Sequence, residues 1–243
     1  MTRGRARIGA LVPFTNTNLE PDLAMLRPDG VSLHFARLGG YDADEIPDDA
    51  QMHGLGAADL DDELRLIQGV RPDLILYGCT SATLTHGPSF DRDLAAKIKA
   101  QSGAETVTAA GAVVHAMRAL GVTRIGFASP YVGAINDQAI AFFAEKGIET
   151  VSRADIGVVL DNYGQGALTP EEVFALAMRA DAEDAQALVL SCTDMRSAEV
   201  VDRLEDAIGK PVICSNQAMM FRASEILDLP LSASCGALFR RRA

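Results

Sequence analysis

The sequence lacks the excess of basic residues that nucleic-acid binding requires. It contains 22 Lys and Arg against 33 Asp and Glu in 243 residues, which gives a formal net charge of −11. Binding a phosphate backbone needs basic side chains clustered on one face. Only the terminal run Arg240, Arg241 and Arg242 resembles a cluster, and we interpret it as a solvated tail. We therefore expect no nucleic-acid partner.

Long apolar runs are also missing. The apolar stretch near the beginning, Ile8 to Val12, is shorter than the roughly 7 to 15 apolar residues of a signal peptide. No stretch approaches the about 20 residues that cross a bilayer. We therefore expect a cytoplasmic protein without a membrane partner, and its 48% apolar residues are enough to build a sizeable core.

Cysteine is scarce, and no pair of cysteines has the close spacing of a zinc site. The four cysteines are Cys79, Cys192, Cys214 and Cys235. The histidines are equally scattered, so we expect no metal, and in this setting the thiols should be reduced. The sequence also has no P-loop, no G-x-G-x-x-G and no nucleophile elbow. These absences predict no cofactor and exclude a serine hydrolase.

What the sequence does contain is an alternation of short apolar strands with helical patterns. Strands are expected at residues 7–13, 31–38, 73–79, 122–131, 149–153 and 187–192. Helices are expected near residues 59–69, 91–102, 134–146, 170–180 and 198–208. This alternation predicts parallel sheets with crossover helices.

The alternation repeats once along the chain. "RIGALVP" matches "RIGFASP", and the strands that lead to Cys79 and Cys192 match at nearly the same offset. We predict an α/β fold with two similar Rossmann-like lobes, whose parallel sheets are related by a pseudo-two-fold axis. Lobe one comprises residues 1–109 and 213–243, and lobe two comprises residues 110–212. The active site should lie between the lobes, at the carboxyl ends of the strands.

Two thiols occupy matching positions in this repeat. "LILYGCTSAT" and "LVLSCTDMRS" each give an apolar strand, a small residue, and then Cys79 or Cys192 followed by Thr. A thiol before a helix can have a lowered pKa, and two facing thiols can serve as acid and base or as nucleophile and proton donor. The alternative is that both are small buried apolar residues. The repeat favours catalysis, whereas we interpret Cys214 and Cys235 as structural.

Polar residues near these strand ends are candidates for binding a small carboxylate substrate. The candidates are Asn16 and Thr17 in "FTNTNLEPD", Thr80 and Ser81 after Cys79, Tyr131 in "SPYVG", Asn162 in "LDNYGQG", and Thr193. Amide and hydroxyl donors of this kind can bind anions near a helix N-terminus. Helix capping, packing and turn formation are the alternative roles. Asp194 and Arg196 are interpreted as solvated helix residues, with a substrate contact as the alternative.

These motifs resemble the aspartate/glutamate racemase superfamily and are most similar to its maleate cis-trans isomerases, across about residues 7 to 230. Five separated positions carry the resemblance: Asn16, Cys79, Tyr131, Asn162 and Cys192. It implies that Cys79 adds to maleate, that the succinyl adduct rotates, and that fumarate leaves. It further implies that Cys192 handles the proton or supports the intermediate, and that Asn16, Tyr131 and Asn162 hold the carboxylates. The resemblance also implies that no cofactor is used and that the protein forms a homodimer or higher homo-oligomer.

Some features leave other functions open. Phe14 stands where small residues are common, and the Cys-Thr elements are more similar to those of amino-acid racemases. A racemase of aspartate, glutamate or a hydantoin, with Cys79 and Cys192 as a two-base pair, is therefore the main alternative. A binding module without chemistry is a third. The single-cysteine arylmalonate decarboxylases of the same fold lack a thiol where Cys79 stands.

Overall fold

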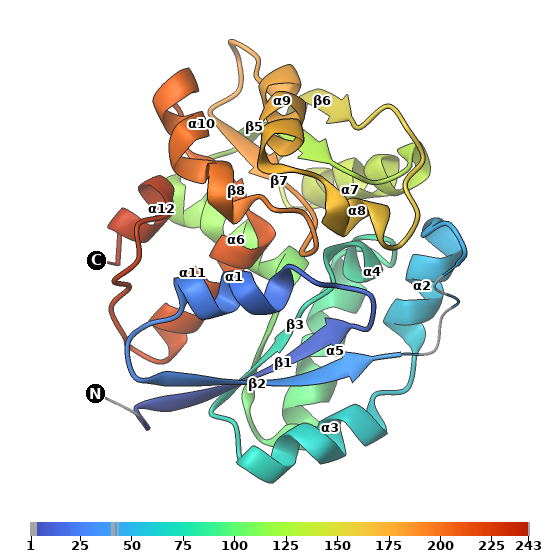
Figure 1. The fold of residues 1–243 in the computed structure, drawn as a ribbon, viewed down its shortest axis with the longest axis vertical. Helices are drawn as coiled ribbons and strands as arrows, with labels where there is room; N and C mark the ends of the chain where they lie inside the picture. The colour runs from blue at the N-terminus through green and yellow to red at the C-terminus, as the bar shows by residue number, and fades with distance from the viewer. Residues whose placement is uncertain (1–3, 40–41, 43, 243) are drawn as a thin grey trace.

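The computed structural model describes residues 4–39, 42 and 44–242. Within them lie two parallel four-stranded sheets, with strand orders β2-β1-β3-β4 and β6-β5-β7-β8 (Figure 1). The first contains β1 (Ala6–Pro13), β2 (Val31–Leu38), β3 (Leu74–Tyr77) and β4 (Glu105–Thr108). The second contains β5 (Arg124–Ser129), β6 (Glu149–Asp155), β7 (Ala187–Leu190) and β8 (Val212–Cys214). The identical strand order confirms the predicted pair of similar α/β lobes.

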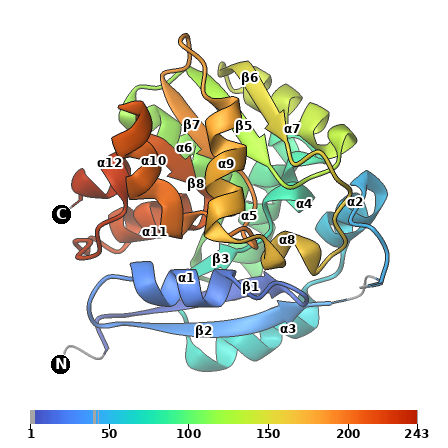
Figure 2. The same ribbon diagram turned by 45° about the horizontal axis from the view of Figure 1, so that its top comes forward.

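Helices cover both sheets. Those of the first half are α1 (Leu19–Leu26), α2 (Asp49–Ala57), α3 (Asp61–Ile67), α4 (Thr80–Leu84), α5 (Pro88–Ser102) and α6 (Ala109–Leu120). Those of the second half are α7 (Gly133–Glu145), α8 (Gly164–Ala167), α9 (Pro170–Ala180), α10 (Val201–Ile208), α11 (Ser215–Ile226) and α12 (Gly236–Arg240). Figure 2 shows α1 on one face of the first sheet and α3 on the other.

The central strands explain why the sequence shows continuous apolar runs. β3 and β7 are buried along their whole length, and each lies between two parallel neighbours. Strands covered on both faces need apolar side chains at successive positions rather than at alternate ones. The edge strands β2 and β6 are only partly buried. The core therefore runs through both sheets and the helices between them.

Helices α6 and α11 pack against each other between the two sheets (Figure 1). Each directly follows the last strand of its own sheet, so Thr108 and Cys214 hold equivalent positions. Strand β8 completes the second sheet, whereas α11 also packs against α1 of the first lobe. The division into residues 1–109 with 213–243 and residues 110–212 stays a prediction.

The expected helices are present, with shifted ends. The helix expected at 170–180 coincides with α9, whose Thr169 and Glu172 form a capping box. The one expected at 198–208 begins with a 3-10 turn, Ala198–Val200, before α10. Sequence analysis did not find α2, because its apolar residues have no helical period. In the described residues, no helix is both long enough and apolar enough to cross a membrane.

Candidate active site

A cavity of about 40 Å³ lies where the strands β1, β3, β5 and β7 end. Fifteen residues line it: Pro13, Thr15, Asn16, Pro47, Met52, Leu55, Cys79, Thr80, Ser81, Tyr131, Asn162, Gln165, Cys192, Thr193 and Asp194. Both lobes contribute, so the predicted location between the lobes agrees with the structure. None of these described lining residues is Lys, Arg or His. An anion bound here would therefore meet neutral hydrogen-bond donors and the carboxyl group of Asp194.

Cys79 lies between β3 and α4, at the position that precedes the helix. Its neighbour Gly78 is required there, because a Cβ on Gly78 would lie 2.3 Å from a side-chain atom of Leu19. Burial raises the pKa of the Cys79 thiol, while hydrogen bonds from the backbone of Ala82 and from Ser81 oppose the rise. The expected lowering of this pKa is outweighed by desolvation, because the five-residue helix α4 offers only a few donors.

Cys192 follows β7 in the second lobe and is held in a different environment. Its Sγ donates to Oε1 of Gln165 at 3.4 Å and accepts from the backbone N–H of Asp194 at 3.4 Å. Burial, and next the charge of Asp194, raise the pKa of Cys192 to about 12. Cys192 therefore keeps its proton at neutral pH. The two thiols have matching positions but unlike surroundings.

Tyr131 follows β5 and is 4% exposed. Its phenol makes a hydrogen bond with Cys192, and burial together with the nearby Cys192 and Cys79 sulfurs raises its pKa well above the usual value. The backbone of Tyr131 is fixed by Ser129, whose Oγ accepts its N–H at 3.2 Å, and by Asn136, whose Nδ2 donates to its carbonyl at 3.3 Å. The structure thus places a neutral phenol beside both thiols.

Asn16 makes the helix-capping contacts that were considered for it, and its amide nitrogen also reaches the other lobe. Its Oδ1 accepts from the N–H groups of Asn18 and Leu19 at the start of α1, at 3.1 and 2.9 Å. Its Nδ2 donates at 3.0 Å to Oγ1 of Thr193, and that hydroxyl donates at 2.8 Å to the Gly78 carbonyl. Asn16 therefore caps a helix and also joins the two lobes.

Thr17 and Thr80 were candidates for binding substrate, and their hydrogen bonds in the structure go to other protein groups. Thr17 is exposed and does not line the cavity, and Thr15 lines it instead. The backbone N–H of Thr17 donates to Oδ1 of Asp194 at 2.8 Å, and its side chain also makes a hydrogen bond with Asp194. Thr80 lines the cavity, but its hydroxyl donates to Ser215 of α11 at 3.0 Å. Ser81, by contrast, lies 3.6 Å from the Cys79 sulfur.

Asn162 closes the cavity from the second lobe. Its Nδ2 donates to the carbonyls of Glu45 at 2.8 Å and Asp42 at 3.4 Å. These carbonyls belong to the connection between β2 and α2 in the first lobe, and Met52 of α2 also lines the cavity. The segment around α8 and the segment before α2 are thus held together across the opening.

Asp194 was interpreted as a solvated helix residue, and the structure corrects this. It is 6% exposed, lies outside any helix and lines the cavity. Burial raises its pKa to about 6, against hydrogen bonds from Thr17 and Asn18. Arg196 does lie at the surface, paired with Glu199 at 2.7 Å. The "CTDMRS" stretch has no periodic pattern from which the burial of Asp194 and the exposure of Arg196 could have been predicted.

Sequence analysis also missed Gln165, Met52 and a buried acid behind the site. Asp22 of α1 is 5% exposed, and burial raises its pKa to about 7. Nδ2 of Asn216 donates to Asp22 at 2.7 Å and to the Thr193 carbonyl at 3.0 Å. Asp22 is therefore one residue removed from the cavity wall.

All four cysteines are buried, free thiols. Cys214 and Cys235 do not line the cavity, in agreement with the structural role expected for them. In the described part of the chain, no group of three His, Cys, Asp or Glu side chains could hold a metal ion.

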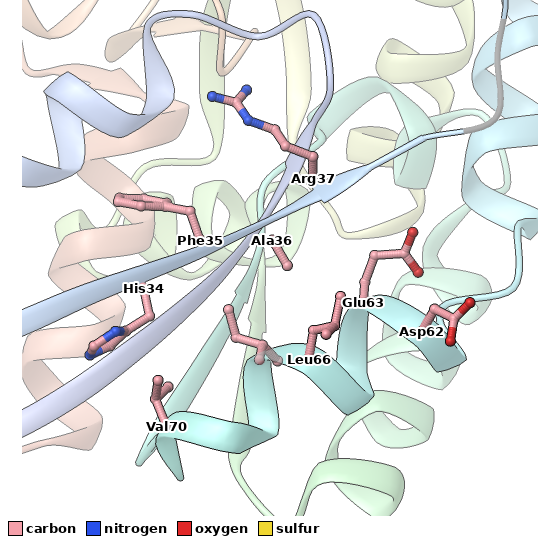
Figure 3. Close-up of a pocket in the computed structure, with 9 residues that line it drawn as sticks. His34, Phe35, Ala36, Arg37, Asp62, Glu63, Leu66 and Val70 are labelled. Atoms are coloured by element: carbon pink, nitrogen blue, oxygen red, sulfur yellow. The ribbon is translucent and has the colours of Figure 1, made fainter.

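A larger hollow of about 470 Å³ lies outside the site, between edge strand β2 and α3 (Figure 3). Arg37 points away from α3 in this view, and its guanidinium donates to the carbonyls of Asn16 at 2.5 Å and Pro13 at 3.3 Å. Arg37 thus supports the loop that carries Asn16. The hollow itself contains none of the predicted site residues.

The arrangement matches a known family. A family model described as arylmalonate decarboxylase matches residues 8–239 of the chain. The chain belongs to the arylmalonate decarboxylase family. Its relatives include proteins of that name and maleate isomerases, which confirms the resemblance found in the motifs.

Curated relatives of this family member match nearly end to end. Maleate isomerase of Nocardia farcinica is 29% identical and is covered over 97% of its length by 98% of this chain. Maleate isomerase of Geobacillus stearothermophilus is 26% identical, with 92% of each chain covered. Arylmalonate decarboxylase of Bordetella bronchiseptica is also 26% identical, with 86% of this chain and 82% of the relative covered.

Solved structures of the family share the fold. Maleate cis-trans isomerase of Nocardia farcinica bound to TRIS has a TM-score of 0.88 at 26% identity, with 97% of this chain and 98% of that chain covered. A cysteine-to-serine mutant of the same enzyme, with a covalently bound succinylcysteine intermediate, has a TM-score of 0.88 at 25% identity, with 98% and 99% covered. The two-lobed α/β fold is confirmed.

Proposed function

We propose that the protein is a cofactor-independent isomerase that converts maleate to fumarate through a covalent adduct on Cys79. The observation that carries this proposal is the pair of buried thiols, Cys79 and Cys192, which line one cavity from matching positions of the two lobes. Their family supports it, since several relatives are maleate isomerases and one solved relative holds a succinylcysteine. The neutral donors around the cavity suit a small carboxylate.

The first step is addition of the thiolate form of Cys79 to the double bond. A carbon–sulfur bond forms, and the π electrons move to the neighbouring carbon and its carboxylate. Hydrogen bonds from Ser81 and the Ala82 backbone favour the thiolate of Cys79. Cys192 has the charge of Asp194 beside it instead. Cys79 is therefore the better nucleophile of the pair.

The second step uses Cys192 as the acid. Its thiol donates a proton to the carbon that holds the negative charge, which leaves a succinyl group on Cys79. The former double bond is now single and rotates. The Cys192 thiolate then takes the proton back, the carbon–sulfur bond breaks, and fumarate leaves, which restores the Cys79 thiolate and the Cys192 thiol.

The carboxylates of the substrate are held by uncharged groups in this proposal. Asn16, Asn162 and Tyr131 supply amide and phenol donors, and Thr80, Ser81 and Thr193 supply hydroxyl or backbone donors. The cavity of about 40 Å³ is small for a four-carbon diacid, so we expect its wall around Met52 and Asn162 to widen when substrate binds.

Proton NMR of maleate with the purified protein tests the proposal. We expect the fumarate signal to appear without added cofactor, and Cys79→Ser to abolish it. Cys214→Ser is the matched control, because Cys214 also ends a strand but does not line the cavity. Full turnover by Cys79→Ser would contradict the covalent mechanism.

A racemase is the second candidate, favoured by the placement of both thiols against one cavity. Cys79 and Cys192 would then remove and return an α-proton of aspartate, glutamate or a hydantoin. In deuterated buffer, that reaction exchanges the α-proton, and the NMR signal at Cα disappears. Exchange at Cα with maleate left untouched would favour the racemase.

We also propose a cytoplasmic location and a homodimer or higher homo-oligomer. Four buried free thiols support a reducing compartment, and the oligomer rests on the family resemblance. Fractionation of cells with an antibody tests the first, and light scattering of the purified protein tests the second. A mass equal to one chain of 25.8 kDa would exclude the oligomer.

A further inference from the structure

We propose that Gln165 and Asp194 keep the proton of Cys192 on its sulfur and aim it into the cavity, so that both act directly on the acid of the reaction. This inference rests on the proposed isomerase function. It assigns a role to Gln165, which was not predicted from the sequence, and to Asp194, which was interpreted as solvated with a substrate contact as the alternative.

Gln165 contacts the sulfur itself. Its Oε1 accepts the Cys192 thiol at 3.4 Å, and both residues line the cavity. An acceptor for the S–H stabilises the protonated form, because ionisation would leave the amide oxygen facing a negative sulfur. The same hydrogen bond fixes the direction of the S–H. Gln165 therefore sets both the protonation and the orientation of Cys192.

Asp194 adds a negative charge close to the same sulfur. Its carboxylate Oδ1 accepts from the backbone N–H groups of Thr17 and Asn18, at 2.8 and 3.0 Å. These donors hold the carboxylate beside Cys192 but do not remove its charge. A second negative charge on Cys192 would be repelled in this buried place.

The position of Gln165 depends on a contact between the lobes. Nδ2 of Asn18 donates to the Gly166 carbonyl at 3.0 Å and to the Asp194 carbonyl at 2.6 Å. Gly166 allows this close approach, because a Cβ there would lie 2.7 Å from Oδ2 of Asp194. Docking of α8 against Asn18 thus brings the Gln165 acceptor to Cys192.

The groups facing Cys192 come from every element around it. Tyr131 is a neutral phenol in hydrogen-bond contact with the sulfur, and Cys79 is the second thiol. Asp194 is the carboxylate that faces it, and Gln165 is uncharged. None of the described lining residues is cationic, so no neighbouring positive charge favours the thiolate.

The test uses two variants of Gln165 and one of Asp194. Gln165→Met keeps the length of the side chain but removes the acceptor, whereas Gln165→Glu keeps an oxygen. Asp194→Asn keeps an acceptor for Thr17 and Asn18 but removes the charge. Gln101→Met is the matched control, because Gln101 is exposed at the end of α5 and bonds Asp61.

The first readout needs no substrate. The rate at which iodoacetamide alkylates Cys192 is measured against pH in a Cys79→Ser background, by peptide mass spectrometry. We expect Gln165→Met and Asp194→Asn each to move the midpoint to lower pH, because each removes an influence that favours the thiol. Unmoved midpoints in both variants would overturn the proposal, even if the protein proved inactive on maleate.

The second readout is turnover of maleate. Misplacing the acid should lower kcat by about tenfold or more in Gln165→Met, with KM nearly unchanged. Gln165→Glu should restore kcat but raise KM, since its charge repels a dianionic substrate. If Gln165 had only a structural role, Gln165→Met and Gln165→Glu would both lose thermal stability and would change kcat and KM together, with no shift in the alkylation midpoint. That result would also overturn the proposal. Failure of the unmodified protein to convert maleate would instead refute the proposed function.

Discussion

The stability of the protein should fall as the pH rises from about 4 to 7, because Asp22 is buried in its neutral form. Burial raises the pKa of Asp22 from 3.8 to about 7. Between these values the folded chain holds a proton that the unfolded chain has released. Folding then becomes less favourable with each step in pH, and the loss is complete above the folded pKa.

The size of this effect follows from the pKa rise. Each pKa unit is worth about 1.4 kcal/mol, so the rise from 3.8 to about 7 corresponds to at most about 4 kcal/mol of unfolding free energy. Asp22→Asn is neutral at every pH and keeps an oxygen that can accept from Nδ2 of Asn216. We expect the variant to match the unmodified protein near pH 4 and to exceed its stability by up to about 4 kcal/mol near pH 8.

Urea unfolding followed by far-UV circular dichroism measures this difference, since the chain has no tryptophan for fluorescence. Asp29→Asn, at an exposed position of the same lobe, reports the effect of the chemical change alone. Asp194 titrates in both the variant and the unmodified protein, so its contribution cancels in the comparison. A stability difference that stays constant from about pH 4 to 8 would refute the reasoning.

Two further predictions concern the contacts between the lobes. Thr193→Val should lower the unfolding free energy by about 2 kcal/mol, because Nδ2 of Asn16 and the Gly78 carbonyl lose their buried partner. Urea unfolding measures this change, and an unchanged unfolding midpoint would contradict the prediction. Asn162→Ala removes the donor to the Glu45 and Asp42 carbonyls, so KM for maleate should rise about tenfold. Steady-state kinetics measures this value. An unchanged KM would mean that Asn162 neither closes the cavity nor holds substrate.

Much of the fold was predictable because it depends on local patterns that repeat. The matching "RIGALVP" and "RIGFASP" segments predicted two equivalent lobes, and the two sheets indeed have the same strand order. Buried parallel strands need unbroken apolar runs, which are visible without coordinates. Cys79 and Cys192 were found for the same reason, since each follows such a run. Helix α2 was not predicted, because its apolar residues do not recur with a helical period.

The protonation of the site was decided only by tertiary structure. The sequence placed Cys79 before a helix and suggested a lowered pKa, but burial of the thiol raises it. Asp194 looked solvated because a carboxylate is usually exposed, yet the loop of the other lobe covers it and supplies its hydrogen bonds. Gln165 gave no signal, since its partner Cys192 lies in another part of the chain.

The two α/β lobes, the pair of thiols and the family could all be inferred without coordinates, because strand pattern and motif spacing are properties of neighbouring residues. The tertiary structure decided which polar groups lose water and which donors they meet across the lobes. Desolvation and hydrogen bonding between distant segments set the pKa of a buried group. Cys79 and Cys192 therefore share a sequence motif, and only the folded chain makes one the nucleophile and the other the acid in the proposed reaction.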